Sequence, residues 1–318
     1  MKKIRWGIIG TGSIARQFAA DMAFVPNGVL VAVGSRAPAT AETFASRFEI
    51  PQAYGNYQSL VDDTNVDAVY VATPHTLHLQ NSVSALQAGK AVLCEKPIAP
   101  TATDCEAILK AAQDADSYLM EAMWTYFLPA IRTAKDWASG GRIGEIVRIE
   151  AQFGYPQRYD PGSRAYDPAL AGGVLLDMGI YPIALACLFL PDDPENIGVV
   201  ARKAPTGVDD EVEMVFEYPN CVATLSASFR RKLPNCATIT GTEGCIVIPE
   251  FWQARECQLF QSDKQVDGFT DRRESIGLNY ETIAVGEDLT AGRRQSIVMP
   301  WSTTRRFQAQ MKRVFEKF

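Results

Sequence analysis

The stretch KIRWGIIGTGSIA at residues 3–15 decides the fold. It predicts a buried strand at residues 6–9, then a glycine turn, then an amphipathic helix at residues 14–22. Gly10, Gly12 and Ala15 match the spacing Gly-x-Gly-x-x-Gly/Ala. The first glycine allows a tight turn, the second leaves room for a pyrophosphate, and the alanine lets helix and strand pack closely. This context favours a dinucleotide site over a βα turn without a ligand.

The helix that begins near Ser13 presents free N–H groups and the positive end of its dipole to this turn. Phosphate groups bind well at such helix starts because both features favour an anion. We therefore predict that the cofactor binds at Gly10, Thr11, Gly12, Ser13 and Ile14.

The second predicted strand, residues 29–34, ends at Ser35 and Arg36, where the adenosine ribose of a dinucleotide is expected. An acidic residue there would hold the 2′-hydroxyl of NAD, but neither position is acidic. An arginine beside a hydroxyl suits the 2′-phosphate of NADP, because guanidinium offers several fixed donors. We predict NADP, with NAD less favoured. The alternative is a solvated arginine at a strand end.

Predicted strands alternate with predicted helices as far as residue 120. The strands are at 67–72, 91–94 and 118–120, and the helices at 41–48, 57–62, 77–88 and 103–115. This alternation predicts an α/β domain with a Rossmann-type, doubly wound parallel sheet. Ligands bind beyond the carboxyl ends of such strands, so polar residues that follow different strands should meet at one edge.

Two polar clusters besides the glycine turn follow predicted strands, at residues 73–78 and 95–97. From them we predict further cofactor-binding residues: Thr73, Pro74, His75, His78, Glu95 and Lys96. For the two histidines, the alternative role is hydrogen bonding in a turn and a helix cap. They are the only histidines of the chain and have no Cys or acidic neighbours at ligand spacing, so we predict no metal site.

The pattern changes near residue 124, which predicts an NADP-binding domain at 1–123 and a second domain at 124–318 for substrate binding and dimerisation. A helix is expected at 124–139. Strands then dominate, at 146–153, 197–202, 211–218, 222–229, 237–240 and 245–248. Pro219-Asn220 predicts a hairpin turn. These features predict an α+β domain with a large, mostly antiparallel open sheet. A last helix at 304–317 is expected to pack back on the first domain.

Residues 211–218 alternate strictly, so Val212, Met214, Phe216 and Tyr218 form an apolar face that needs burial. The sheet of a second copy would cover this face in a homodimer. Packing within the chain is the alternative.

Residues 154–173 form a predicted loop rich in Pro, Gly, Arg and Tyr. It is too long for a plain connector, so we interpret it as a wall or lid of the substrate cleft. Arg164 and Tyr166 in this loop, and Phe153 just before it, are predicted substrate residues.

Three side chains are candidates for acid–base chemistry. Lys96 follows a predicted strand, where an ammonium could polarise a substrate C–O bond; the alternative is a surface lysine. Asp177 and Tyr181 lie four residues apart in an apolar run, a spacing that shares one helix face. Pro182 disfavours helical geometry at Tyr181, so the shared face stays open. A lone buried carboxylate is costly, so Asp177 should have a partner, either Lys96 or the substrate.

The composition excludes several classes of partner. The chain has 318 residues, of which 47% are hydrophobic and 21% charged, and a net charge of -6. This charge argues against nucleic acid or an anionic membrane surface as the main partner. The longest apolar run, 180–190, is shorter than the roughly 20 residues that span a bilayer. Seven cysteines without a Cys-x-x-Cys pair are typical of buried thiols, so we predict a cytoplasmic protein.

With these motifs the chain resembles the glucose–fructose oxidoreductase/inositol dehydrogenase/MocA (Gfo/Idh/MocA) family from end to end. The motifs are residues 10–15, 73–78, 95–97 and 172–181. The segments MEAMWT at 120–125 and LAGGVLLDMGIY at 170–181 resemble its branch of dimeric dihydrodiol and NADP-dependent D-xylose dehydrogenases. Tyr181 stands where many family members carry His. That branch usually has Arg where this chain has Tyr126, which leaves the substrate open.

The resemblance implies that Lys96, Asp177 and Tyr181 are catalytic and that Trp124 forms a wall near the nicotinamide and the substrate. It implies hydride transfer between NADP and the hydroxyl of a sugar or cyclic diol. It also implies a homodimer formed through the C-terminal sheet. Two alternatives on the same scaffold are an aldose–aldose oxidoreductase with a tightly held cofactor and a non-enzymatic NADP-sensing regulator.

Overall fold

The computed structural model describes residues 3–318, which fall into two compact units. The first unit runs to Trp124 and includes Glu274–Arg305, whereas the second contains Thr125–Arg273 and Arg306–Phe318. The sequence predicted a single domain boundary after residue 123, whereas in the structure residues 274–305 also belong to the first unit. Asp21 gives the physical reason: its carboxylate accepts hydrogen bonds of 2.9–3.0 Å from the backbone N–H groups of residues 276–278, which fixes this later segment to the first unit.

In the described part of the chain, the first unit has six strands and six helices of regular α-geometry that lie wholly within it. They are β1 (Ile4–Ile9), α1 (Ser13–Asp21), β2 (Gly28–Gly34), α2 (Pro38–Phe48), β3 (Gln52–Tyr54), α3 (Tyr57–Val61), β4 (Ala68–Val71), α4 (His78–Gln87), β5 (Ala91–Glu95), α5 (Ala102–Asp114), β6 (Leu119–Ala122) and α8 (Leu278–Thr290). The strand order is β3-β2-β1-β4-β5-β6, and every pair is parallel. The predicted doubly wound Rossmann sheet is therefore confirmed.

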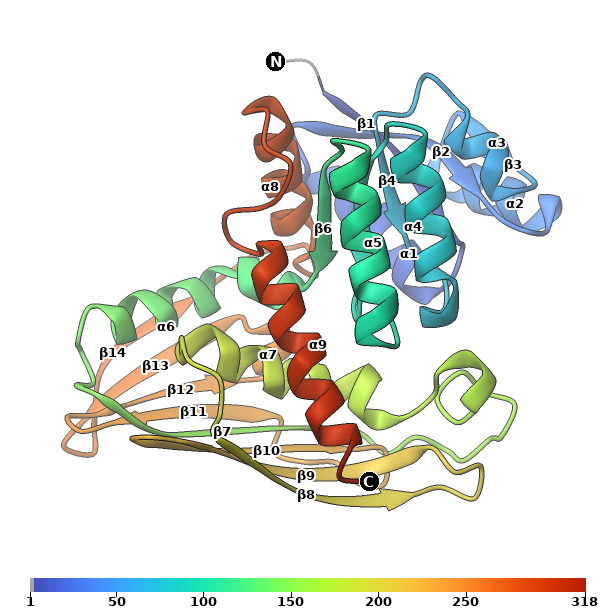
Figure 1. Ribbon diagram of the computed structural model, residues 1–318. Coiled ribbons are helices and arrows are strands. Elements are labelled where there is room, and N and C mark those ends of the chain that lie inside the picture. Colours follow the sequence, from blue (N-terminus) through green and yellow to red (C-terminus); the bar gives the residue numbers. More distant parts are fainter. Residues whose placement is uncertain (1–2) are drawn as a thin grey trace. The chain divides into compact units, whose positions relative to one another are not determined.

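The strand order of the first sheet reverses between β1 and β4, which is where such folds bind ligands. Helices α4 and α5 lie side by side over one face of this sheet (Figure 1). Their apolar side chains join those of the strands in a buried core. On the other face, Phe18 of α1 stacks on Tyr70 of β4 with ring centroids 3.9 Å apart. Both faces are covered, which explains why β4 is apolar throughout.

The second unit is built on an eight-stranded sheet. Its elements are α6 (Pro129–Ser139), β7 (Ile146–Gly154), α7 (Ile180–Phe189), β8 (Asn196–Lys203), β9 (Asp209–Tyr218), β10 (Cys221–Ser228), β11 (Cys236–Gly241), β12 (Cys245–Pro249), β13 (Glu256–Gln261) and β14 (Lys264–Thr270), with most of α9 (Trp301–Phe315). The order is β14-β13-β12-β11-β7-β10-β9-β8. Only β7 and β10 pair in parallel, so the predicted mostly antiparallel sheet is confirmed.

Strands β9 and β10 form the predicted hairpin, with Tyr218 paired to Cys221 around Pro219-Asn220. The apolar side chains of β9 are buried within the chain itself. Helices α6 and α7 lie on one face of the sheet, and α7 contacts β7 and β10 (Figure 1). The expectation that this apolar face needs a second copy to cover it is therefore wrong, because the chain's own helices cover it.

Several elements, among them β13, β14 and α8, were not predicted from the sequence, and one predicted helix is broken. Strand β14 is mostly exposed and polar, so it lacks an apolar alternation. Strand β13 and helix α8 also escaped prediction. The predicted helix at 124–139 is a short 3₁₀ turn, Trp124–Phe127, followed by α6. Pro129 explains the break, since Leu128 before it is held in an extended conformation.

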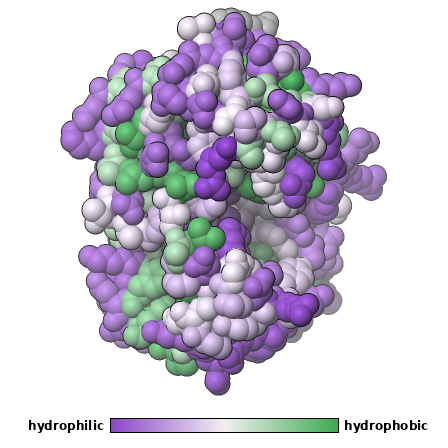
Figure 2. All heavy atoms as spheres, turned by 90° about the vertical axis from the view of Figure 1, so that its right-hand side faces the viewer, coloured by the Kyte–Doolittle hydropathy of each residue, from purple (hydrophilic) through white to green (hydrophobic). Residues whose placement is uncertain are grey.

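One helical stretch, Pro168–Phe189, is long and apolar enough to span a membrane by length and composition alone. The longest uninterrupted apolar run within it is still residues 180–190, as the sequence indicates. The most apolar window of this stretch is 83% buried inside the structure, which is typical of a core helix. One face of the molecule bears mainly hydrophilic side chains, with hydrophobic ones in smaller patches (Figure 2).

Candidate active site

The glycine turn after β1 has the geometry that a pyrophosphate needs. Gly10 has a φ of +109°, and a Cβ there would lie 2.6 Å from the carbonyl oxygen of Ala72, so a side chain is excluded. A Cβ on Gly12 would point into open space, which leaves its backbone approachable. No side chain caps the start of α1 and its first turn has no acidic residue. Its N–H groups can therefore bind phosphate oxygens.

The other predicted residues of this turn fit the same function. Thr11 and Ile14 are partly buried, whereas Gly12 and Ser13 are exposed at the helix start. Ala15 is fully buried where α1 packs on the sheet. The turn thus presents its backbone, rather than side chains, to a ligand.

A pocket of about 470 Å³ lies beside the end of β2. Its lining residues include Arg36, Asn56, Tyr57 and Leu77. Burial raises the pKa of the Tyr57 phenol, and the guanidinium of Arg36 beside it offsets part of that rise. Ser35 is buried, and its hydroxyl accepts a hydrogen bond of 3.3 Å from the Ala37 N–H. The pocket can therefore hold an adenosine with a guanidinium and a phenol at its edge.

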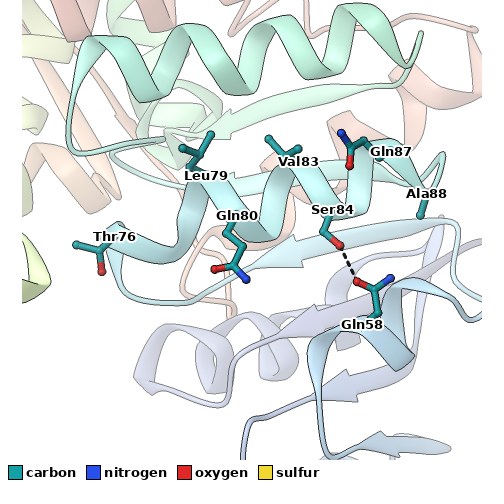
Figure 3. A pocket seen from close by; sticks show the side chains of 8 residues that line it. All are labelled: Gln58, Thr76, Leu79, Gln80, Val83, Ser84, Gln87 and Ala88. Atoms are coloured by element: carbon teal, nitrogen blue, oxygen red, sulfur yellow. Dashed lines mark hydrogen bonds between the residues drawn. The ribbon is translucent and has the colours of Figure 1, made fainter.

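A second, shallower pocket of about 720 Å³ adjoins it along α4. It is lined by uncharged side chains, and Ser84 donates to Gln58 at 3.2 Å across it (Figure 3). It shares Gln58, Gln80 and Ser84 with the adenosine pocket. None of the predicted site residues lines it.

His78 connects the two polar loops that follow β4 and β5. Its ring is fully buried, with Nδ1 2.9 Å from the carbonyl oxygen of Pro97 and Nε2 2.9 Å from that of Thr73. Burial lowers the pKa of this imidazole to about 4. The Thr73 hydroxyl accepts from Asn81 at 3.1 Å, and the ring of His75 meets His78 edge-on. Residues 73–78 and 95–97, predicted to meet, are thus joined through one side chain.

Lys96 is partly buried at the end of β5, directly after the buried Glu95. The Glu95 carboxylate accepts a hydrogen bond from the Tyr70 hydroxyl and another of 3.2 Å from the Lys96 N–H. Glu95 therefore shapes the turn that presents Lys96, at the carboxyl edge of the sheet where ligands bind.

Asp177 and Tyr181 lie in the second unit, on a helical segment of changing geometry. A π-helical turn, Leu175–Gly179, carries Asp177, and α7 begins at Ile180 and carries Tyr181. Such π turns are frequent at functional sites. Asp177 pairs with Arg164 of the loop at 2.9 Å, so this carboxylate has a charged neighbour. Both residues line a polar pocket of about 710 Å³. A partnership of Asp177 with Lys96 or the substrate stays a prediction.

An aromatic cluster contacts Tyr181 through Phe153. Phe153 meets the Tyr181 ring edge-on at 5.5 Å and stacks on Trp252 with centroids 4.1 Å apart. Tyr155 and Phe251 pack edge-on against the same Trp252. Sequence analysis named Phe153 but missed the others. The adjacent aromatics at 251–252 were the available signal, but only the fold brings them beside Tyr181.

Two further predicted site residues, Tyr166 and Trp124, differ in burial. Tyr166 is buried, packs against Phe229 and donates to the Gln157 carbonyl at 3.1 Å, so it holds the loop together. Trp124 is partly buried in its 3₁₀ turn. Tyr126, the residue that departs from the branch pattern, donates to the Ala184 carbonyl of α7 at 2.6 Å. This hydrogen bond ties Tyr126 to α7, and the effect of the departure on substrate choice stays a prediction.

The first unit contains Lys96 and the glycine turn, and the second contains Asp177, Tyr181 and the aromatic cluster. Within residues 3–318, no group of three or more His, Cys, Asp or Glu side chains is arranged to hold a metal ion. The arrangement provides a dinucleotide turn and an ammonium on one unit, and a phenol and a carboxylate on the other.

Comparison with known proteins identifies the class to which this fold and site belong. Residues 4–123 match the oxidoreductase family with an NAD-binding Rossmann fold, and residues 131–247 match the GFO/IDH/MocA C-terminal domain. The chain belongs to the GFO/IDH/MocA family of oxidoreductases.

The chain is also similar to particular members. It is 36% identical to the trans-1,2-dihydrobenzene-1,2-diol dehydrogenase of Mus musculus, over 93% of this chain and 91% of that protein. The human protein of that name is 35% identical, over 94% and 92%. Among solved structures, a 3-ketoreductase from Actinomadura kijaniata in complex with NADP has a TM-score of 0.88 at 26% identity, covering 99% of this chain and 98% of that one.

The aldose–aldose oxidoreductase of Caulobacter crescentus, in complex with glycerol, shares the fold with a TM-score of 0.90. It is 23% identical and the match covers 99% of this chain and 97% of that chain.

Proposed function

We propose that this oxidoreductase transfers hydride between NADP and a hydroxyl group of a sugar or cyclic diol. The observation that carries the proposal is that one unit contains Tyr181 beside an aromatic wall, while the other contains both Lys96 and the glycine turn. The similarity to dihydrodiol dehydrogenases supports the substrate class. The reaction requires the two units to bring Lys96 and Tyr181 to one substrate.

The chain's own side chains handle the proton. A nicotinamide dinucleotide held at the glycine turn would supply the hydride acceptor. Tyr181 takes the proton of the reacting hydroxyl, and the Lys96 ammonium favours the phenolate form that this step needs. Asp177 orients Lys96 or binds a second hydroxyl of the substrate. Trp124 forms a wall near the nicotinamide.

The preference for NADP rests on the adenosine pocket. Arg36 and Tyr57 place a guanidinium and a hydroxyl at its edge, and neither Ser35 nor Arg36 is an acid that would bind the 2′-hydroxyl of NAD. The bound NADP of the Actinomadura relative is consistent with this preference.

We also propose a homodimer in the cytoplasm. The outward face of the large sheet exposes Val200, Val215 and Val222 on the neighbouring strands β8, β9 and β10. Exposed apolar side chains on a sheet face can pack against the same face of a second copy of the chain. All seven cysteines are free thiols, which agrees with a reducing compartment.

The test is a panel of pentoses, hexoses, polyols and cyclic diols, assayed with NADP⁺ and NAD⁺ side by side by absorbance of the reduced cofactor. Tyr181→Phe should lower kcat by about 10²–10⁴-fold, since it removes the general base. The control Tyr218→Phe removes a buried hydroxyl that has no hydrogen-bond partner, so it should keep the rate.

Full activity of Tyr181→Phe across pH would contradict the assignment of the base. Purified protein that already carries nicotinamide absorbance and exchanges it slowly would favour an aldose–aldose oxidoreductase. Binding of NADP with no turnover on the whole panel would favour a regulator instead.

A further inference from the structure

The peptide group directly after Lys96-Pro97 is held from both sides by buried ionisable side chains. The N–H of Ile98 donates to Glu121 Oε1 at 2.9 Å. The carbonyl oxygen of Pro97 lies 2.9 Å from Nδ1 of His78. The C=O of Pro97 and the N–H of Ile98 belong to the same peptide unit. Glu121 therefore holds one end of this unit and His78 holds the other.

We propose that His78 and Glu121 are positioning residues that fix the Pro97–Ile98 peptide and thereby set the position of Lys96. The inference rests on the proposed function in that it takes Lys96 to be catalytic. Neither residue needs to touch the substrate, because both act on the backbone that carries Lys96.

Both side chains are buried, so the loss of either contact would be costly. His78 is 0% exposed and Glu121 is 1% exposed, so water cannot replace a lost hydrogen bond at either site. Glu121 lies on the buried strand β6, where an apolar side chain would avoid the cost of burying a carboxyl group. An ionisable side chain among apolar strand residues therefore needs a reason, and the Ile98 N–H supplies one.

Burial and several nearby groups shift the pKa values of Glu121 and His78. Burial raises the pKa of Glu121 to about 7, while the Ile98 N–H, Thr304 and the Lys96 ammonium lower it and Glu95 raises it. The thiols of Cys94 and Cys105 also face this carboxyl. Burial and the nearby ammonium of Lys96 lower the pKa of His78. The backbone groups at Thr73, Pro97 and Ile98 raise it.

The two residues should differ in one respect. Glu121 holds the loop of Lys96 and also interacts with the Thr304 hydroxyl, whereas His78 also lies 2.9 Å from the Thr73 carbonyl of the predicted cofactor loop. Loss of Glu121 should therefore impair catalysis alone. Loss of His78 should impair both catalysis and cofactor binding.

The experiment compares Glu121→Leu, Glu121→Gln, His78→Leu and a matched control in the full chain. The control, Glu281→Gln, changes a fully buried carboxyl on α8 whose two oxygens have no hydrogen-bond partner. For each variant we would measure kcat, the Kd of NADPH by fluorescence, and hydrogen–deuterium exchange of the peptide containing Ile98.

Glu121→Leu should lower kcat by about 10–100-fold, because a small misplacement of a reacting group is costly, and leave the Kd of NADPH within about 2-fold. Glu121→Gln keeps an acceptor for the Ile98 N–H, so it should restore most of the rate. His78→Leu should lower kcat and also raise the Kd. Exchange at Ile98 should speed up in Glu121→Leu and stay slow in Glu121→Gln and in the control.

Two outcomes would overturn the proposal. One is a Glu121→Leu protein with wild-type kcat and wild-type exchange at Ile98. The other is equal impairment of all variants, Glu281→Gln included, which would indicate a general loss of packing. The exchange measurement needs no substrate. A wild-type protein without dehydrogenase activity would thus refute the proposed function, while exchange at Ile98 would still decide the positioning of this peptide.

Discussion

The proposed preference for NADP depends on Arg36. It is exposed at the end of β2, borders the adenosine pocket and lies beside the Tyr57 phenol. A guanidinium in this position matches a phosphate geometrically and electrostatically, whereas it gains little from a neutral ribose hydroxyl.

Arg36→Ala should therefore weaken NADPH binding by about 10–100-fold, the equivalent of one lost charge-assisted hydrogen bond, and change NADH binding little. Fluorescence titration with both reduced cofactors measures this difference. Arg47→Ala, at the end of α2, is the matched surface control. Equal weakening of NADH and NADPH would show that Arg36 does not select the phosphate.

Asp209 governs the element that carries Asp177 and Tyr181. This buried carboxyl accepts a hydrogen bond of 2.6 Å from the Leu175 N–H at the start of the π-helical turn. Gly173 packs against it with a φ of +127°, and a Cβ there would collide with Asp209 Oδ1. The position of the segment thus depends on a carboxyl of a neighbouring strand and on a glycine that no other residue can replace.

Burial raises the pKa of Asp209 to about 6. Its usual value in an unfolded chain is near 3.8. The folded state therefore favours the protonated form, and the stability this gives is lost as pH rises from about 4 through 6. Asp209→Asn removes this dependence while keeping an acceptor oxygen.

The free energy of unfolding of Asp209→Asn, relative to wild type, should therefore rise by up to about 3 kcal/mol from pH 4 to pH 8. Urea denaturation at these pH values measures it. Asp263→Asn, in the exposed turn between β13 and β14, is the matched surface control. A constant difference for Asp209→Asn would mean that Asp209 titrates normally.

For the whole molecule, the proposed homodimer would form through the outward face of the large sheet. Val200, Val215 and Val222 are 69%, 39% and 37% exposed, and their strands are adjacent. Glu213 and Glu217 flank Val215 on the same face, so a further negative charge there would oppose a face-to-face contact.

Light scattering at micromolar concentration should give a wild-type mass of about twice 34.9 kDa. Val215→Asp should reduce it to the mass of one chain. Ile297→Asp, at an exposed residue outside the sheet, should leave it unchanged. A wild-type mass of one chain would remove the dimer.

The sequence by itself determined the local features of this protein. The glycine turn, the strand–helix alternation of the first unit and the hairpin at Pro219-Asn220 depend on neighbouring residues, so periodicity and turn chemistry predicted them. Strand β14 and helix α8 could not be predicted in this way, because their polar or mixed sequences become ordered only through contacts with distant parts of the chain.

Only the tertiary structure decided how the site is supported. It joined the loops after β4 and β5 through His78, placed Glu121 on the peptide after Lys96, and brought Trp252 to the aromatic wall beside Tyr181. It also assigned residues 274–305 to the first unit and buried the apolar face of β9 under the chain's own helices. These contacts join residues far apart in the chain, and their geometry depends on packing, which local sequence patterns do not encode.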